Sequence, residues 1–422
     1  MIAVLKTTWS LLLGVALLMV GNGMQSTLLG IRGGIEGVAT QQMAIVMAGY
    51  FAGFLAGSLL VPRLIQRVGH VRVFAALGSL ISAILILYPA LPWWPAWAIG
   101  RFLIGLSFCG VYITAESWLN AGVSNETRGQ ALSAYMIVQM LGIVAGQGLL
   151  NIGDPAGYLP FVIPSVLVSL AFTPILLSTE PAPRFDTIQR MSFARLWQVS
   201  PLGCVGIFLM GGVFSALFGM ASVWGTEAGL NTREVSAFVA AIYLGGMVFL
   251  WPIGKLSDRS DRRVLILALA ALGVATVAGM LVIEPGIWGI LLAAALLGGV
   301  VNPLYSLLLA YTNDLIDSRD MAAASAGLLF INGVGAFTGP VLTGWLMALL
   351  GLDGFWVYVG LLLGLLAGYA GWRRTRRATI GRSSAFTTIS PVASPVAVEA
   401  ALDAAPAPAA APGDRPGTER PA

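Results

Sequence analysis

Long apolar runs, interrupted by short polar segments, follow one another along almost the whole chain. An α-helix needs about 20 apolar residues to cross the hydrocarbon core of a bilayer, because the core is about 30 Å thick and the helix rises about 1.5 Å per residue. The clearest runs are Leu11–Val20, Ile81–Ile99, Phe161–Leu177, Val264–Ile283, Ile287–Val301 and Val357–Ala370. The pattern therefore predicts membrane-spanning helices.

We expect twelve spans, at residues 5–30, 41–64, 71–92, 96–120, 128–151, 158–178, 198–225, 232–255, 263–283, 286–312, 321–349 and 353–372. The longest polar connection, 179–197, divides them into two sets of six. The predicted fold class is an all-α membrane protein with two pseudo-symmetric six-helix bundles, residues 1–178 and 198–372. Residues 373–422 become rich in Ala, Pro, Ser and Thr, and we predict a disordered tail there.

The two predicted bundles repeat each other at an offset of about 192 residues. Gly53 falls opposite Gly245, and Arg67 falls opposite Arg259. Parallel repeats of six helices, related by an axis along the membrane normal, place a substrate site between the halves near the bilayer midplane. A duplicated body of this kind is typical of a carrier.

The amino-acid composition is that of a membrane protein, and the distribution of basic residues predicts which side of the membrane each loop faces. The chain is 57% hydrophobic and 10% charged, whereas soluble domains are about 25% charged. With a cytoplasmic N-terminus, the predicted outer loops keep only Arg32 and Arg233, while most other basic residues fall on the inner side. The positive-inside rule then places both termini in the cytoplasm of a multi-pass cytoplasmic-membrane protein. The net charge of +4 does not imply a nucleic-acid partner.

The sequence contains few residues that could form a disulfide, a metal site, a cofactor site or a catalytic centre. Cys109 and Cys204 each lie inside an apolar run, which argues against a disulfide and against a metal site. We expect no cofactor, because no nucleotide-binding loop is present. A membrane enzyme would need clustered catalytic groups, so with a single histidine, His70, expected in a solvated inner loop, we predict no enzyme.

Two ionisable residues fall within the predicted fourth span, and such residues are costly at membrane depth. Arg101, Phe108, Tyr112 and Glu116 follow the spacing of one helix face. Arg101 and Glu116 are about 22 Å apart along the helix axis, so each needs its own partner.

Each of these residues has two interpretations. Arg101 is either an anion-facing cation of the cavity or a structural hub that donates to backbone carbonyls. Glu116 is either a proton-coupling carboxylate or an ionised partner of Arg128 or Arg319. Its depth near the inner end of the helix favours the second interpretation.

Two loops and two helix segments contain distinctive motifs. The loop GKLSDRSDRR begins at Gly254, and its first-half counterpart QRVGHVR begins at Gln66; RFLIG begins at Arg101 and ETRGQ at Glu126. As a set, these motifs resemble those of the major facilitator superfamily, although that family usually has Asp where this sequence has Gln66. YFAG at Tyr50, with ES, AYM and a GxxxGQ motif, is similar to its bacterial YcaD-like branch.

The resemblance implies alternating access around a cavity lined by the first, fourth, seventh and tenth spans. The substrate-pathway residues would then be Asn22, Gln25, Arg101, Tyr112, Ser222, Asn302, Tyr305 and Ser306. For each of them, hydrogen bonding between helices is the alternative. The cytoplasmic gate loops would contain Arg67, Gly69, Arg72, Arg128, Gly254, Asp258, Arg259, Arg262, Arg263 and Arg319.

These observations predict a secondary transporter for a small solute, with proton coupling as an open hypothesis. A single arginine among amides and aromatic residues favours an organic anion or a zwitterion as the substrate. We expect a monomer in contact with membrane lipid. The alternative is a sensor or scaffold of the same fold that does not transport.

Overall fold

The computed structural model describes residues 2–124, 127–176, 191–317, 320–376, 389, 397–398 and 400–401, and within them every regular element is helical. The first half contains α1 (Ile2–Ile35), α2 (Thr40–Val68), α3 (His70–Ala90), α4 (Trp94–Ala121), α5 (Arg128–Leu149), the short η1 (Leu150–Ile152) and α6 (Leu159–Leu176). The second half contains α7 (Phe193–Val199), α8 (Pro201–Ser215), η2 (Ala216–Met220), α9 (Ala221–Glu227), α10 (Thr232–Ser257), α11 (Arg262–Ile283), α12 (Ile287–Asn313), α13 (Met321–Leu350) and α14 (Asp353–Arg376).

In this part of the chain, eleven helical segments are long and apolar enough to cross a membrane, and α6 is apolar but shorter. The predicted all-α membrane fold is confirmed. The seventh span is α8, η2 and α9 in sequence, because a π-helical stretch at Ala216–Met220 interrupts the α-helical pattern. The short helix α7 begins in the segment expected to be the linker, 179–197, and ends two residues beyond it.

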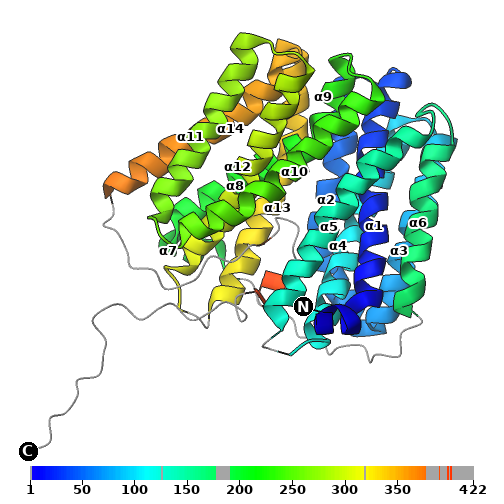
Figure 1. Cartoon of the computed structure of the whole chain (residues 1–422), viewed down its shortest axis with the longest axis horizontal. Coiled ribbons are helices and arrows are strands. Elements are labelled where there is room, and N and C mark those ends of the chain that lie inside the picture. Colours follow the sequence, from blue (N-terminus) through cyan, green and yellow to red (C-terminus); the bar gives the residue numbers. More distant parts are fainter. Residues whose placement is uncertain are drawn as a thin grey trace, which may run out of the picture.

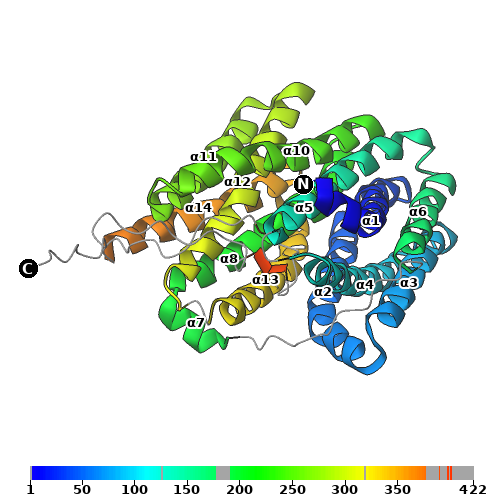
Figure 2. The same cartoon turned by 60° about the horizontal axis from the view of Figure 1, so that its bottom comes forward.

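The halves stand side by side, with α1–α6 on one side and α7–α14 on the other (Figures 1 and 2). We call the face at which α1 begins and α14 ends the terminal face, and the other the opposite face. Each span begins at one face and ends at the other. The charge pattern predicts that the terminal face is cytoplasmic.

One close contact between two helix backbones occurs at equivalent positions in the two halves. A Cβ atom at Gly53 of α2 would overlap the carbonyl oxygen of Phe102 in α4, and a Cβ atom at Gly245 of α10 would overlap that of Ala295 in α12. Glycine allows two helix backbones to approach this closely. The equivalent glycines are 192 residues apart in the sequence, so the offset predicted from the sequence matches the packing.

Several of the contacts between the halves lie toward the opposite face, where α1 and α13 end and where α2 begins. The side chain of Thr40 donates a hydrogen bond to Glu227, and Gly344 packs against Ala44. Gly30 and Gly34 leave no space for a side chain beside Ser222 and Thr226. The two halves are therefore packed together at the opposite face.

Five described residues that follow α14 in the sequence are buried. α14 continues through Arg376, four residues beyond the expected boundary at 372. Most of the expected disordered tail lies outside the described residues. Beyond α14, the described residues of the expected tail are buried, namely Ile389, Ala397, Val398, Ala400 and Ala401.

Candidate substrate cavity between the halves

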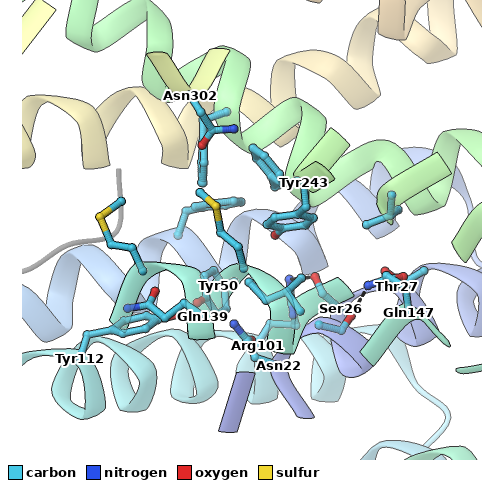
Figure 3. A pocket seen from close by; sticks show the side chains of 18 residues that line it. Asn22, Ser26, Thr27, Tyr50, Arg101, Tyr112, Gln139, Gln147, Tyr243 and Asn302 are labelled. Atoms are coloured by element: carbon cyan, nitrogen blue, oxygen red, sulfur yellow. Dashed lines mark hydrogen bonds between the residues drawn. The ribbon is translucent and has the colours of Figure 1, made fainter. Parts of the chain in front are cut away.

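A cavity with roughly 900 Å³ of empty space, including its opening, lies between the two halves. The first half lines it with α1, α2, α4 and α5, and the second half with α8, η2, α10 and α12. Figure 3 shows Tyr243 and Asn302 of the second half facing the polar side chains of the first half. Its polar lining residues are Asn22, Ser26, Thr27, Tyr50, Arg101, Tyr112, Gln139, Gln147, Tyr243 and Asn302.

Arg101 of α4 is the cation of this cavity and is 1% exposed. Its guanidinium donates to the side-chain oxygen of Gln25 at 3.0 Å and to the hydroxyl of Ser26 at 3.3 Å. The Tyr50 ring lies beneath it, with the Cζ atom 4.9 Å from the ring centroid. These neutral groups hold the arginine in place between α1 and α2.

Among the described residues, no carboxylate forms an ion pair with Arg101, and its Nε atom has no hydrogen-bond partner. Removing a cation from water without a counterion costs several kcal/mol. Arg101 therefore leaves both a positive charge and a donor unsatisfied at the cavity. An anion that enters the cavity would satisfy both.

Gln147 of α5 supplies the complementary group. Its amide nitrogen donates to the backbone oxygen of Gly23 at 2.8 Å, while its side-chain oxygen is buried without a partner. Buried polar atoms are usually hydrogen-bonded. Among the described lining residues, Arg101 thus has a buried donor and Gln147 a buried acceptor without a hydrogen-bond partner.

The second half contributes an aromatic wall. Phe218 of η2 lies 4.3 Å from Phe214 and 4.5 Å from Tyr243, measured between ring centroids. All three line the cavity. Aromatic rings at such distances form a stable apolar surface that can pack against a ligand. The first half therefore contributes the cation and most of the polar side chains, and the second half contributes an aromatic surface together with the polar groups of Tyr243 and Asn302.

Glu116 does not line the cavity. It lies five residues before the end of α4, on the terminal side, and is 1% exposed. The hydroxyl of Tyr135 in α5 donates to its carboxylate at 3.2 Å. Glu116 and Arg101 thus have separate partners, as their spacing on the helix predicted.

The family of the protein follows from comparison with known proteins. The family model described as the Major Facilitator Superfamily matches residues 11–259 and 203–405. The chain belongs to the major facilitator superfamily. It is accordingly a secondary transporter and a multi-pass membrane protein, and the predicted function and family are confirmed.

The relatives of this superfamily member include bacterial transporters of the predicted branch. The chain is 26% identical over 348 residues to the MFS-type transporter YcaD of Escherichia coli, covering 80% of this chain and 88% of the relative. It is 27% identical over 345 residues to an MFS-type transporter of Enterobacter sp. strain 638, with the same coverage.

Solved structures share the superfamily fold. The nucleoside transporter NupG aligns with a TM-score of 0.71 at 12% identity, covering 87% of this chain and 98% of that chain. A bacterial homolog of the human lysosomal transporter Spinster aligns with a TM-score of 0.66 at 14% identity, covering 94% and 98%.

The structure separates the eight predicted pathway residues into two groups. Four of them, Asn22, Arg101, Tyr112 and Asn302, line the cavity. Gln25 is not part of the lining but accepts a hydrogen bond from Arg101. The other three are buried elsewhere: Ser222 packs on Gly30 toward the opposite face, while Tyr305 and Ser306 follow Asn302 along α12.

Residues of the predicted gate loops differ in their surroundings. Arg67, Arg72, Asp258 and Arg259 are exposed, Gly254 is buried, and Arg128 is partly buried. Gly69 joins α2 to α3 with φ +86°, a conformation that favours glycine. Arg319 lies outside the described residues.

Arg262 and Arg263 of the gate-loop set each form an ion pair, the first of them buried and the second partly exposed at Asp261. Arg262 pairs with Asp314 at 2.6 Å, and Arg263 pairs with Asp261 at 3.1 Å. Both pairs lie within the second half, where the first fixes the start of α11 to the end of α12.

The structure also corrects and extends the expected site. His70, expected in a solvated inner loop, is instead the first residue of α3 and is 3% exposed, while the next two residues of that helix are exposed. Sequence reasoning missed the cavity residues of α2, α5 and α10, such as Tyr50, Gln139 and Tyr243. Gln139 and Gln147 are eight residues apart, so their shared helix face was a usable signal.

Proposed function

We propose that this transporter carries a small organic anion or zwitterion with an apolar portion. The observation that carries the proposal is the buried guanidinium of Arg101, which lines the cavity without an acidic partner among the described residues. A substrate carboxylate would supply the missing counterion. The free oxygen of Gln147 would accept a hydrogen bond from an N–H or O–H of the substrate.

The aromatic wall narrows the class of substrate. Phe214, Phe218 and Tyr243 face the cavity from the half that does not contain Arg101. A ligand with an acid group at one end and an aromatic or branched hydrocarbon group at the other would contact both halves at once. Such contacts can stabilise closure of the two halves around the ligand, which is what alternating access requires.

Transport then follows from the arrangement of the halves. Because they are packed together at the opposite face, substrate would enter or leave at the terminal face in this state. With the terminal face in the cytoplasm, as the charge pattern predicts, this is the inward-facing state of a monomeric carrier in the cytoplasmic membrane. Rocking of the halves would open the opposite face.

Substitution of Arg101 tests the substrate class. Phenylacetate should raise the thermal midpoint of the purified transporter, and phenethylamine should not, because only the acid supplies a counterion. Arg101→Ala should weaken phenylacetate binding at least about tenfold, since the lost charge-assisted hydrogen bonds are worth about 1.5–3 kcal/mol.

Arg195→Ala is the matched control, because this exposed arginine pairs with Asp320 far from the cavity and should leave binding unchanged. Equal stabilisation by the amine, or unchanged phenylacetate binding in the Arg101 variant, would contradict the proposal. Exchange of labelled phenylacetate across proteoliposomes would separate a carrier from a sensor, which binds without exchange.

We further propose that Glu116 couples transport to protons through its contact with Tyr135. Glu116→Gln keeps the size of the side chain but removes the titratable group. Uptake driven by a pH gradient should be lost, while exchange of substrate at equal pH should persist. If gradient-driven uptake survives in the variant, Glu116 is a structural partner of its neighbours.

A further inference from the structure

One side of α14 is exposed along the part of the helix that approaches the terminal face. Leu361, Leu365 and Trp372 are 53%, 52% and 50% exposed, and Gly368 between them is exposed as well. Their spacing along the sequence keeps these four positions on one face of a helix. Since α14 has the length and hydropathy of a membrane span, this apolar face is in position to contact lipid.

The exposed face ends in two arginines that flank the Trp372 ring. The Cζ atom of Arg373 lies 6.0 Å from the ring centroid, and the Cζ atom of Arg376 lies 5.9 Å from it. Both distances are typical of cation–π contacts. Among the described residues, no carboxylate forms an ion pair with either arginine. Both positive charges are therefore available to an anion.

Neighbouring contacts leave this side of the helix end open. The ring centroid of Tyr369 lies 5.7 Å from that of Trp372, so the two rings support each other. Arg374 acts elsewhere, because its charge helps to lower the pKa of Asp261 at the start of α11. Figures 1 and 2 both show the orange end of α14 at the outer edge of the second half, away from the first half.

The exposed face is about as long as one leaflet of a bilayer is thick. Leu361 and Arg376 are 15 residues apart, which is about 22 Å of helix at about 1.5 Å per residue. Half of a bilayer, with its headgroup region, is about 20–22 Å thick. The leucines then lie at the depth of the acyl chains, and Trp372 lies at the interface, where indole rings concentrate. The arginines lie at the depth of the phosphates.

We propose that the face of α14 from Leu361 to Arg376 binds an anionic phospholipid from the leaflet at the terminal face. Arg373 and Arg376 bind the headgroup phosphate through charge-assisted hydrogen bonds. The acyl chains lie along the leucines and over Gly368, where a Cβ atom would meet no heavy atom within 4 Å. The apolar part of the face favours a lipid over a soluble anion. This site is separate from the cavity, so it does not depend on the substrate proposed above.

Lipid titration of the purified full-length protein in a neutral detergent tests the site. Phosphatidylglycerol should raise the thermal midpoint of unfolding. Phosphatidylcholine with the same acyl chains should not, because its choline group balances the phosphate charge. Arg373→Gln combined with Arg376→Gln should weaken phosphatidylglycerol binding about thirtyfold, since each arginine near an anionic surface contributes about a factor of five in affinity. Equal stabilisation by the two lipids would overturn the proposal.

Arg63→Gln combined with Arg67→Gln is the matched control. These changes remove two exposed positive charges from the end of α2, at the same face but in the other half, and should leave lipid binding unchanged. Equal weakening by the two pairs would mean that the whole charged face attracts the lipid, and would overturn a local site. Inorganic phosphate should not stabilise the protein. If it stabilises as well as the lipid, the site binds a free anion and the lipid proposal fails.

A second substitution tests the aromatic part of the site. Trp372→Leu keeps an apolar side chain but removes the ring between the arginines, and should reduce phosphatidylglycerol binding severalfold. Trp345→Leu is its control, because Trp345 is 54% exposed on α13 and lies toward the opposite face. Native mass spectrometry of the lipid-bound protein gives an independent measure of the retained lipid. Unchanged retention in both the Trp372 variant and the double arginine variant would overturn the site.

Discussion

At the scale of single residues, the placement of Arg101 depends on a short chain of neutral groups. Gln25 accepts a hydrogen bond from Arg101 at 3.0 Å and donates to Asn22 at 3.1 Å. The amide thus orients the guanidinium without neutralising it. The positive charge remains available to a ligand because residue 25 is a glutamine and not a glutamate.

This arrangement makes Gln25→Glu an informative substitution. The new carboxylate would pair with Arg101 and replace the substrate as its counterion. We expect the affinity for phenylacetate to fall at least about tenfold, or about 1.4 kcal/mol, with no loss of thermal stability. Gln41→Glu, at an exposed position of α2, is the control for added charge. Titration calorimetry measures the affinities, and unaltered binding to the Gln25 variant would contradict this role.

At the scale of an element, the start of α11 is fixed by Asp261. Its side chain accepts a hydrogen bond from the backbone N–H of Arg263 at 2.9 Å, which caps the helix. Partial burial raises the pKa of Asp261, but the side-chain and backbone hydrogen bonds from Arg263, with the charges of Arg263 and Arg374, outweigh it. The pKa of this carboxyl group therefore lies below its usual value.

This shift predicts how the cap depends on pH. Because the folded pKa is the lower one, the ionised carboxylate stabilises the fold above the unfolded pKa, and the contribution disappears as the pH falls through the folded value. Asp261→Ala should cost about 0.5–2 kcal/mol at neutral pH. Thermal unfolding across the acid range should show the variant and the wild type converging at low pH. A constant difference would mean that the cap does not titrate.

At the scale of the whole molecule, the packing of the halves at the opposite face defines the state of the carrier. A Cβ atom at Gly34 would lie 3.6 Å from the Cβ atom of Thr226 across the interface. This is within the range found in disulfide bonds, about 3.5–4.5 Å. The two positions come from α1 and α9, one in each half.

A disulfide at this position should lock the transporter. In a chain without Cys109 and Cys204, Gly34→Cys with Thr226→Cys should cross-link under oxidation and abolish exchange of labelled phenylacetate across proteoliposomes. A reducing agent should restore exchange, and each single variant should be insensitive to both treatments. Full exchange by the oxidised pair would show that the opposite face need not open.

The sequence by itself determined the helical membrane fold, the division into two repeats and the family. These depend on the length of apolar runs and on residues close together in the chain, such as the loop that begins at Gly254. A helix face could also be deduced from spacing, which is how Arg101 and Tyr112 were placed together.

Only the tertiary structure decided which sides of the different helices pack together and line the cavity. Tyr50, Gln147 and Tyr243 reach one cavity from three helices far apart in the sequence, and no local pattern encodes that meeting. The structure alone also placed Ile389 beside Ser306, 83 residues away along the chain. Apolar residues are required equally for contact with lipid, with another helix and with a residue beyond the last helix, so their pattern cannot distinguish these partners.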